Sequence, residues 1–139
     1  MLLLDNSAWA RFDDSSLAHT RSEQIAQWMD AGELGVCLPF LLEAGYSARS
    51  AAHHDTIMRE LQALPTVAVD AEIERLALGA QQALARAGHH RVPPSDLVIA
   101  TCAHVVGAGV LHYDRDYDVI AGRTDLEFTS EWLAPAGSL

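Results

Sequence analysis

Three aspartates occupy every second position of the segment HYDRDYD, residues 112–118, directly after the apolar run GAGVL. They are Asp114, Asp116 and Asp118, and they are part of an excess of acids that gives the chain a formal net charge of −10. An isolated triplet of this kind is typical of a solvated loop. The functional alternative is a cation site, because carboxylate oxygens are preferred ligands of hard divalent cations.

Three further acids stand alone in apolar surroundings. Asp5 follows the run LLL, Glu43 lies within PFLLEAGY, and Asp96 follows PPS at the start of a long apolar stretch. A buried carboxylate without a partner costs several kcal/mol or becomes neutral, so such groups rarely stay unpaired. The nine arginines are too few and too scattered to pair them all. One divalent cation would satisfy several carboxylates at once, and oxygen ligands without histidine or thiolate favour magnesium or manganese.

Two other ligand-binding patterns are incomplete in this sequence. Asp114, Asp116 and Asp118 match positions one, three and five of an EF-hand calcium loop, but Val119 stands where that loop needs glycine, and Asp125 where it needs glutamate. GAGVLH is similar to a glycine-rich dinucleotide motif, but it precedes a predicted strand, and a histidine replaces the third glycine. We therefore expect neither a calcium loop nor a dinucleotide site.

Histidine and cysteine do not show the spacing of a zinc site. None of the seven histidines, which include the pairs at 53–54 and 89–90, fits an HExxH or zinc-finger pattern, so we expect them at the surface. The exception is His104, which lies in an apolar stretch and is expected to be a hydrogen-bonded core residue. Cys37 and Cys102 have apolar neighbours and no CxxC spacing, which predicts two buried thiols.

The composition limits the size, compartment and partners of the protein. A chain of 139 residues is long enough for one domain and too short for two. No apolar run reaches the roughly 18 residues of a membrane span, and the N-terminus lacks a secretory signal, so we expect a cytoplasmic protein. The absence of lysine excludes a P-loop or Schiff-base lysine. A pI near 4.9 argues against a nucleic-acid partner, unless the acids hold metal ions.

Short apolar runs alternate with helical patterns along the chain, which predicts an α/β fold with a parallel sheet covered on both faces. In such a sheet, sites form at the carboxyl ends of the strands. The isolated acids and the aspartate triplet fall at strand ends or near helix starts, so we expect them at one edge. The predicted strands are 2–4, 36–38, 67–69, 110–113 and 126–128. The predicted helices are 17–31, 39–64 as two helices that meet near SAAHHD at residues 50–55, 71–87 followed by Gly88, and 93–107 capped by Ser95.

Four segments together resemble the acidic motifs of PIN-domain proteins, in particular the VapC-type toxins of bacterial toxin–antitoxin systems. The segments are LLLDNSAW, PFLLEAGYSAR, PPSDLVIATCA and VLHYDRDYDVIA, and they span essentially the whole chain. The resemblance implies a three-layer αβα fold with a central parallel sheet of four or five strands, in a single PIN domain over residues 1–139. It also implies a magnesium- or manganese-dependent ribonuclease that forms a homodimer and is inhibited by a cognate VapB-type antitoxin.

By this resemblance, the catalytic acids are Asp5, Glu43, Asp96, Asp114 and Asp116. Asp5 and Asp96 would ligate the cation directly, and Asp114 and Asp116 would hold a second ion directly or through water. Glu43 would ligate the cation or orient the attacking water. The expected reaction is hydrolysis of a phosphodiester in RNA, such as transfer or ribosomal RNA, by a metal-activated water.

Three other residues are candidates for contacts with the substrate. Ser7 matches a small hydroxyl residue that follows the first aspartate in the family, and Arg91 and Arg115 are candidate phosphate contacts. Asp118 has no fixed role in the family, and we expect it to be solvated or to cap a helix.

A second interpretation is a non-catalytic PIN-like module whose acidic pocket receives a basic protein segment. In a toxin the two interpretations coexist, because an arginine or lysine of the antitoxin could occupy the pocket in place of metal. The aromatic residues that could line a groove for this partner, or pack in the core, are Trp9, Phe12, Trp28 and Phe40.

Overall fold

A five-stranded parallel sheet forms the centre of the computed structural model, which describes residues 1–139. Every neighbouring pair of strands is parallel, and the order across the sheet is β3-β2-β1-β4-β5. The predicted α/β class and parallel sheet are therefore confirmed. The strands are β1 (Leu2–Leu4), β2 (Leu34–Cys37), β3 (Thr66–Val67), β4 (Gly109–His112) and β5 (Thr129–Trp132).

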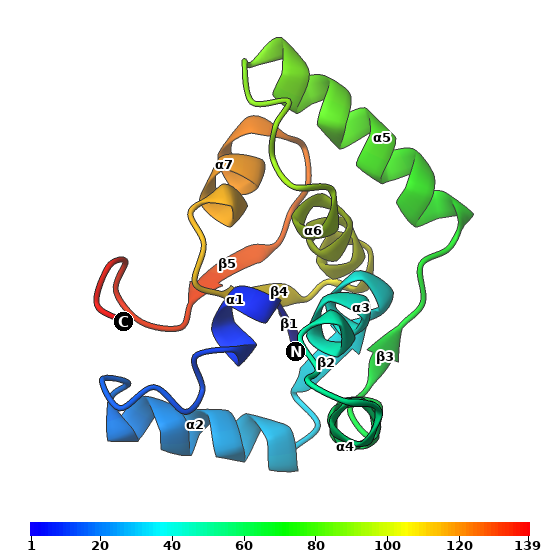
Figure 1. The fold of residues 1–139 in the computed structure, drawn as a ribbon. Coiled ribbons are helices and arrows are strands. Elements are labelled where there is room, and N and C mark those ends of the chain that lie inside the picture. The colour runs from blue at the N-terminus through cyan, green and yellow to red at the C-terminus, as the bar shows by residue number, and fades with distance from the viewer.

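Helices cover both faces of the sheet. They are α1 (Asn6–Trp9), α2 (His19–Asp30), α3 (Leu38–Tyr46), α4 (Ala51–Leu61), α5 (Ala71–Arg86), α6 (Pro94–Val106) and α7 (Asp116–Arg123). Figure 1 shows α5, α6 and α7 over one face, and α2 and α4 over the other, which confirms the three-layer arrangement. The predicted helix pair over 39–64 is also confirmed, with its break at residues 47–50.

Two local predictions are wrong. The fifth strand lies at 129–132 and not at 126–128. Leu126 and Phe128 are apolar because they pack against the core, and not because they belong to a strand. Strand β5 pairs only with β4, so it lies at the edge of the sheet, where polar residues are tolerated. Ser95 does not cap α6. The N-cap is Pro93, which makes no side-chain hydrogen bond, and Ser95 lies inside the first turn.

Helix α6 is apolar nearly all round because other elements surround it. It packs against β1 and β4 of the sheet and against α3, α5 and α7. Cys37 at the end of β2 and Cys102 on α6 are both buried free thiols, as predicted. No helix of the protein combines the length and the apolar character needed to cross a membrane.

The four aromatic residues named as groove or core candidates contribute to the core. Phe40 is fully buried, and Trp9 lies edge-on to it with the ring centroids 6.1 Å apart. Phe12 and Trp28 are partly buried and pack against the same core. Core packing therefore accounts for these side chains.

The glycines of GAGVL have structural roles in the connection from α6 to β4. Gly107 ends α6 with a φ of +67°, a conformation that residues with a Cβ rarely adopt. Gly109 begins β4 between two neighbouring strands, where a Cβ would lie 2.7 Å from Leu2 Cδ2 and 2.8 Å from the carbonyl oxygen of Thr129. Backbone geometry therefore explains both glycines.

The direction of the chain across the sheet reverses beside β1. From β1 the chain moves to β2 and β3 on one side, and α5 and α6 then carry it back to β4 on the other side of β1. In open parallel sheets, ligands bind outside the carboxyl ends of the two strands at such a reversal. The crevice beyond β1 and β4 is therefore where a site is expected.

Candidate metal centre

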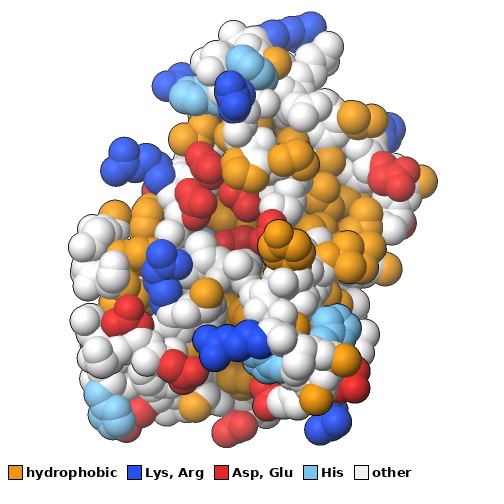
Figure 2. Space-filling model, in the orientation of Figure 1, with side chains coloured by type: hydrophobic (Ala, Val, Ile, Leu, Met, Phe, Trp, Pro, Cys, Tyr) orange, Lys and Arg blue, Asp and Glu red, His pale blue; other side chains and the backbone are white.

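Five carboxylates meet at the carboxyl ends of β1 and β4, and we call them the acidic site. Asp5 directly follows β1, Asp114 lies two residues after β4, and Asp116 begins α7. Asp96 lies in the first turn of α6, and Glu43 lies on α3. Figure 2 shows acidic side chains gathered at the middle of the face seen in Figure 1. The structure thus brings together all five acids named from the sequence.

Asp5 is held rigidly at the end of β1 by both of its oxygens. It is 3% exposed; its Oδ2 accepts hydrogen bonds from the backbone N–H of Ser7, at 2.8 Å, and from the Ser7 hydroxyl, and its Oδ1 accepts one from the Tyr117 hydroxyl at 2.8 Å. Ser7 Oγ also accepts from the backbone N–H of Tyr113 at 2.9 Å, so it joins the ends of β1 and β4. Ser7 therefore positions Asp5, and the role of Tyr117 is one that the sequence did not indicate.

Asp96 is the acid whose charge is least compensated. It is 6% exposed, and its Oδ2 is buried without a hydrogen-bond partner. Burial, followed by the charges of Asp5, Asp114, Asp116 and Glu43, raises the pKa of Asp96 from 3.8 to about 8. A position in the first turn of a helix favours the charged carboxylate, so burial and repulsion outweigh the helix dipole here. Only a nearby positive charge would keep this carboxylate fully ionised at neutral pH.

Asp114 and Asp116 complete a cluster with Asp96. One ligand oxygen from each of the three lies within 4.8 Å of the others. Asp114 Oδ1 accepts from the backbone N–H of Asp116 at 2.9 Å, which fixes the turn into α7. Burial and then the charge of Asp114 raise the pKa of Asp116, and His89 opposes them. His89, which was expected at the surface, is half-buried, and its charge acts on Asp116.

Glu43 is connected to the site by Ser95. The Ser95 hydroxyl donates to Glu43 Oε1 at 2.6 Å and so links α6 to α3. Because Ser95 directly precedes Asp96, this bond holds Glu43 beside the cluster. The sequence signal that could have indicated this role is the Ser-Asp pair in the first turn of α6, at the same predicted edge as Glu43.

A chain of directed hydrogen bonds supports Asp114. The backbone N–H of Asp114 donates to Nδ1 of the fully buried His112 at 3.1 Å, so Nε2 carries the proton and donates to Ser130 Oγ at 2.7 Å. Ser130 Oγ then donates to Asp118 Oδ1 at 2.7 Å, and Trp132 Nε1 donates to Asp118 Oδ2 at 3.0 Å. Burial lowers the pKa of His112, which favours this neutral ring. Asp118 is exposed, as expected of a solvated residue, and it also accepts these two hydrogen bonds. His112 is fully buried, so the surface position expected for it is wrong.

The two candidate phosphate contacts are exposed. Arg91 lies in the connection between α5 and α6, Arg115 lies between two acids of the site, and neither forms an ion pair. Residues 53–54 and His90 are exposed, as predicted. His104 accepts a backbone hydrogen bond at 2.9 Å, as predicted, but it is half-buried and does not lie in the core.

The acidic site fits a divalent cation. Its ligand atoms are all carboxylate oxygens, and none of the five acids takes part in an ion pair. The unpartnered Oδ2 of Asp96 has the lone pairs that a cation would use. This donor set suits magnesium or manganese better than the softer metals that histidine and thiolate select.

Fold and site together define an α/β protein with a carboxylate cluster at the reversal point of a parallel sheet. The model of a protein family described as PIN domain matches residues 2–123. The chain belongs to the PIN domain family. The resemblance inferred from its four acidic motifs is therefore confirmed.

The relatives of this chain include ribonucleases of the VapC group. Ribonuclease VapC18 of Mycobacterium tuberculosis is 37% identical over 142 residues, which cover 98% of this chain and 97% of that protein. Ribonuclease VapC11 of the same organism is 33% identical over 133 residues, which cover 94% of this chain and 98% of that protein.

Solved structures with the same fold come from VapBC assemblies. A chain in the crystal structure of DNA-bound VapBC from Salmonella typhimurium gives a TM-score of 0.73 at 20% identity, covering 96% of this chain and 100% of that one. A chain of VapBC-5 from Mycobacterium tuberculosis gives a TM-score of 0.58 at 22% identity, covering 91% of this chain and 95% of that one. These structures confirm the predicted three-layer fold.

Proposed function

We propose that this protein is a VapC-type toxin that cleaves RNA internally and is neutralised by a cognate VapB-type antitoxin. The observation that carries the proposal is the buried, unpartnered carboxylate of Asp96 among four other acids, because this group needs a cation and phosphodiester hydrolysis can use one. Relatives named ribonuclease VapC support the substrate class, and the similar chains in VapBC assemblies support the antitoxin.

The cation in this proposal is Mg²⁺ or Mn²⁺. Asp96, Asp114 and Asp116 would hold it, since their oxygens lie within 4.8 Å of one another, and Asp5 would join them from the end of β1. When bound, the ion supplies positive charge at the scissile phosphodiester and makes water a better nucleophile at neutral pH.

The other residues of the site would position the water and the RNA. Glu43 is held through Oε1 by Ser95, and its Oε2 would orient the attacking water. Ser7 fixes Asp5 by donating its hydroxyl hydrogen to that carboxylate, and the remaining lone pair of its oxygen would accept a hydrogen bond from a ribose hydroxyl of the substrate. Arg91 and Arg115 are exposed and unpaired, and they would bind phosphates on either side of the scissile bond.

The antitoxin would reach the acidic site with a basic side chain. Five carboxylates in a chain with a net charge of −10 attract arginine or lysine as well as metal. A segment bound in this way would block the metal site and stop cleavage. A module that only receives such a segment, without catalysis, is the second candidate function, and the absence of ion pairs in the site is compatible with it.

A homodimer would cover the exposed apolar side chains of α3 and α5, the two helices that flank α6. Leu42 and Tyr46 on α3 are 64% and 94% exposed, and Leu78 on α5 is 70% exposed. Contiguous exposed apolar surface marks protein interfaces, and a symmetric pair is the commonest assembly.

We further propose that residues 1–139 form one PIN domain, because β5 lies beyond the matched range and still pairs with β4, and that the protein acts in the cytoplasm.

The test is cleavage of transfer and ribosomal RNA by the protein purified free of antitoxin. Wild type, Asp96→Asn and the control Asp13→Asn would be compared in EDTA, Mg²⁺ and Mn²⁺; Asp13 is exposed and lies outside the acidic site. We expect internal cleavage by wild type and Asp13→Asn with either metal, none in EDTA, and a loss of orders of magnitude in Asp96→Asn. Cleavage that persists in EDTA would contradict the metal mechanism. A wild type that binds a basic antitoxin segment and never cuts RNA would favour the non-catalytic module.

A further inference from the structure

Apart from Arg115, the residues that line a cleft beside the acidic site have no role in the chemistry described so far. It has a volume of about 740 Å³, within the range of small-molecule pockets, and we call it the β5 cleft. Its lining consists of Leu17 and Ala18 directly before α2, Arg21 on α2, Arg115 and Asp118 from the N-cap and first turn of α7, and residues 132–136 from the end of β5 onward. Because β5 is parallel to β4, the cleft lies at the same edge of the sheet as the acids.

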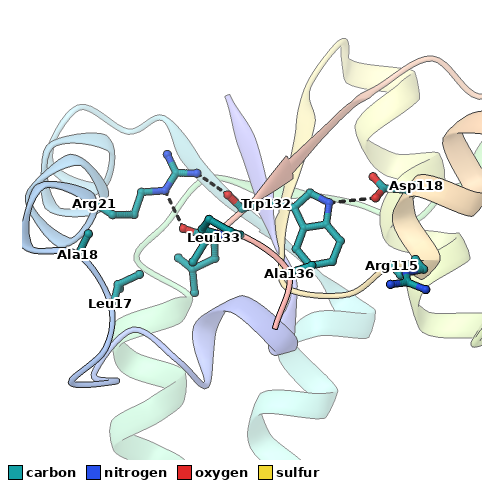
Figure 3. A pocket seen from close by; sticks show the side chains of 10 residues that line it. Leu17, Ala18, Arg21, Arg115, Asp118, Trp132, Leu133 and Ala136 are labelled. Atoms are coloured by element: carbon teal, nitrogen blue, oxygen red, sulfur yellow. Dashed lines mark hydrogen bonds between the residues drawn. The ribbon is translucent and has the colours of Figure 1, made fainter. Parts of the chain in front are cut away.

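The two arginines of the β5 cleft differ in their availability. Arg21 is fully engaged, since it donates to the backbone carbonyls of Trp132 and Leu133 and pairs with Glu131. Arg115 is exposed and forms no ion pair. Figure 3 shows Arg21 on one side of the cleft, Arg115 on the other, and the end of β5 between them. The cleft therefore offers one free cation, at the end next to Asp114 and Asp116.

The rest of the lining suits a flat ring with polar edges. The indole of Trp132 is half-buried, and its bond to Asp118 holds it in place (Figure 3). Leu17, Leu133 and Pro135 add apolar surface. Each oxygen of Asp118 accepts one hydrogen bond from the protein and has a lone pair left for another donor. Nucleobases present such rings and N–H groups, whereas a phosphate would be repelled by Asp118 and would find a favourable contact only at Arg115.

We propose that the β5 cleft binds one unpaired nucleotide of the RNA beside the scissile phosphate, with its base against Trp132 and its phosphate at Arg115. This inference rests on the proposed ribonuclease function and names the form of the substrate. A base within a duplex is stacked and paired, so only a loop, bulge or single strand can supply it. A basic antitoxin segment suits the cleft less well, because Arg115 would repel it and each oxygen of Asp118 already accepts a hydrogen bond, from Ser130 or from Trp132.

The experiment measures RNA binding in EDTA, where the proposed cleavage does not occur. Fluorescently labelled hairpins with an unpaired loop would be compared with a fully paired duplex, on wild type, Arg115→Gln and the control Arg123→Gln. Arg123 is also exposed, lies at the other end of α7 and is absent from the cleft lining. We expect the loop RNA to bind better than the duplex. The affinity for RNA falls as salt rises, and Arg115→Gln should make the slope of log affinity against log salt shallower by about 0.7, the value for one phosphate of a single strand. Arg123→Gln should leave this slope unchanged.

A second measurement locates the base directly. Loop RNA that carries 4-thiouridine would be irradiated on the protein, and we expect the modified peptide to contain residues 132–136. Trp132→Phe should keep the fold and weaken loop binding by about tenfold through poorer stacking. If Trp132→Phe is unstable, the crosslink and the Arg115→Gln slope still decide the question.

The outcomes separate this proposal from the ribonuclease proposal. A crosslink at 132–136 in a protein that never cuts RNA with metal would refute the ribonuclease proposal and support nucleotide binding in the β5 cleft. The opposite outcome is a protein that cuts RNA but crosslinks to it elsewhere, with equal salt slopes for the two arginine variants. This result would overturn the proposal of nucleotide binding in the β5 cleft and leave the ribonuclease proposal standing. Binding of a basic antitoxin peptide in the cleft, together with no preference for loop RNA, would also overturn it.

Discussion

Asp96 combines deep burial with four neighbouring negative charges, so a proton and a metal ion compete for the same oxygens. With a pKa of about 8, the side chain is mostly protonated at pH 7 when no cation is present. A bound cation would favour the charged form and release that proton. Folding stability, pH and metal affinity should therefore be linked through this one residue.

The stability of the metal-free protein should fall as pH rises from about 4 to about 8, the interval between the ordinary and the raised pKa of Asp96. In this interval the folded chain keeps a proton on Asp96 that the unfolded chain has lost, so raising the pH favours unfolding, by at most about 1.4 kcal/mol per pH unit. Urea unfolding in EDTA would measure the free energy of unfolding of wild type and of Asp96→Asn at each pH. Subtracting one value from the other cancels the contributions of the other titrating groups. A difference that stays constant with pH would contradict the prediction.

The acids of the site can be found from the sequence, and so can Ser7 as a residue of the site, but most of the residues that hold the acids cannot. Asp5 and Asp114 follow apolar strands, and the edge that they share is implied by any parallel sheet. Tyr117, Ser130 and His112 act through hydrogen bonds to residues on other elements. Nothing in their local sequence indicates which distant group each will meet.

Among the elements, β4 has the tightest fit to its neighbours at its first residue. Gly109→Ala should destabilise the protein by about 1–3 kcal/mol, because the new Cβ would lie 2.8 Å from the backbone oxygen of Thr129, which cannot move without shifting β5. Gly79→Ala in the middle of α5 is the matched control. Nothing lies within 4 Å of its Cβ position, so this change should stabilise by about 0.5–1 kcal/mol. Thermal or chemical unfolding of both variants measures the contrast, and equal effects would show that the strand contact is unimportant.

The predictability of each element follows from how it is buried. Strands β1, β2 and β4 are buried, so their apolar runs indicate them, and α5 and α6 show clear helical patterns with glycine at their ends. Strand β5 lies at the edge and has the sequence TSEW, which shows no such run. Helices α1 and α7 have four and eight residues, too few for a periodic pattern to stand out.

At the scale of the whole molecule, the exposed apolar side chains of α3 and α5 should control assembly. Leu78→Glu would place two charges in the proposed symmetric interface, one from each copy, and should weaken the dimer by at least about tenfold. Met29→Glu is the control, since Met29 is 41% exposed on α2 in the opposite layer. Sedimentation of the antitoxin-free protein would compare the two variants. A monomeric wild type, or dimers that survive both changes equally, would contradict the proposed interface.

The hydrogen-bond chain from Asp114 to Trp132 also ties part of the acidic site to the motion of an edge strand. Strand β5 has one neighbour, so it should detach from the sheet more often than the central strands do. Each detachment removes Ser130 and Trp132 from Asp118 and leaves His112 without its acceptor. We therefore expect the amide hydrogen of Asp114 to exchange with solvent at the rate of β5, whereas that of Asp5, bonded to Leu111 in β4, should exchange only on global unfolding. Amide exchange followed by NMR would show this difference, and it would mean that mild heat or denaturant disables the Asp114 side of the site before the protein unfolds.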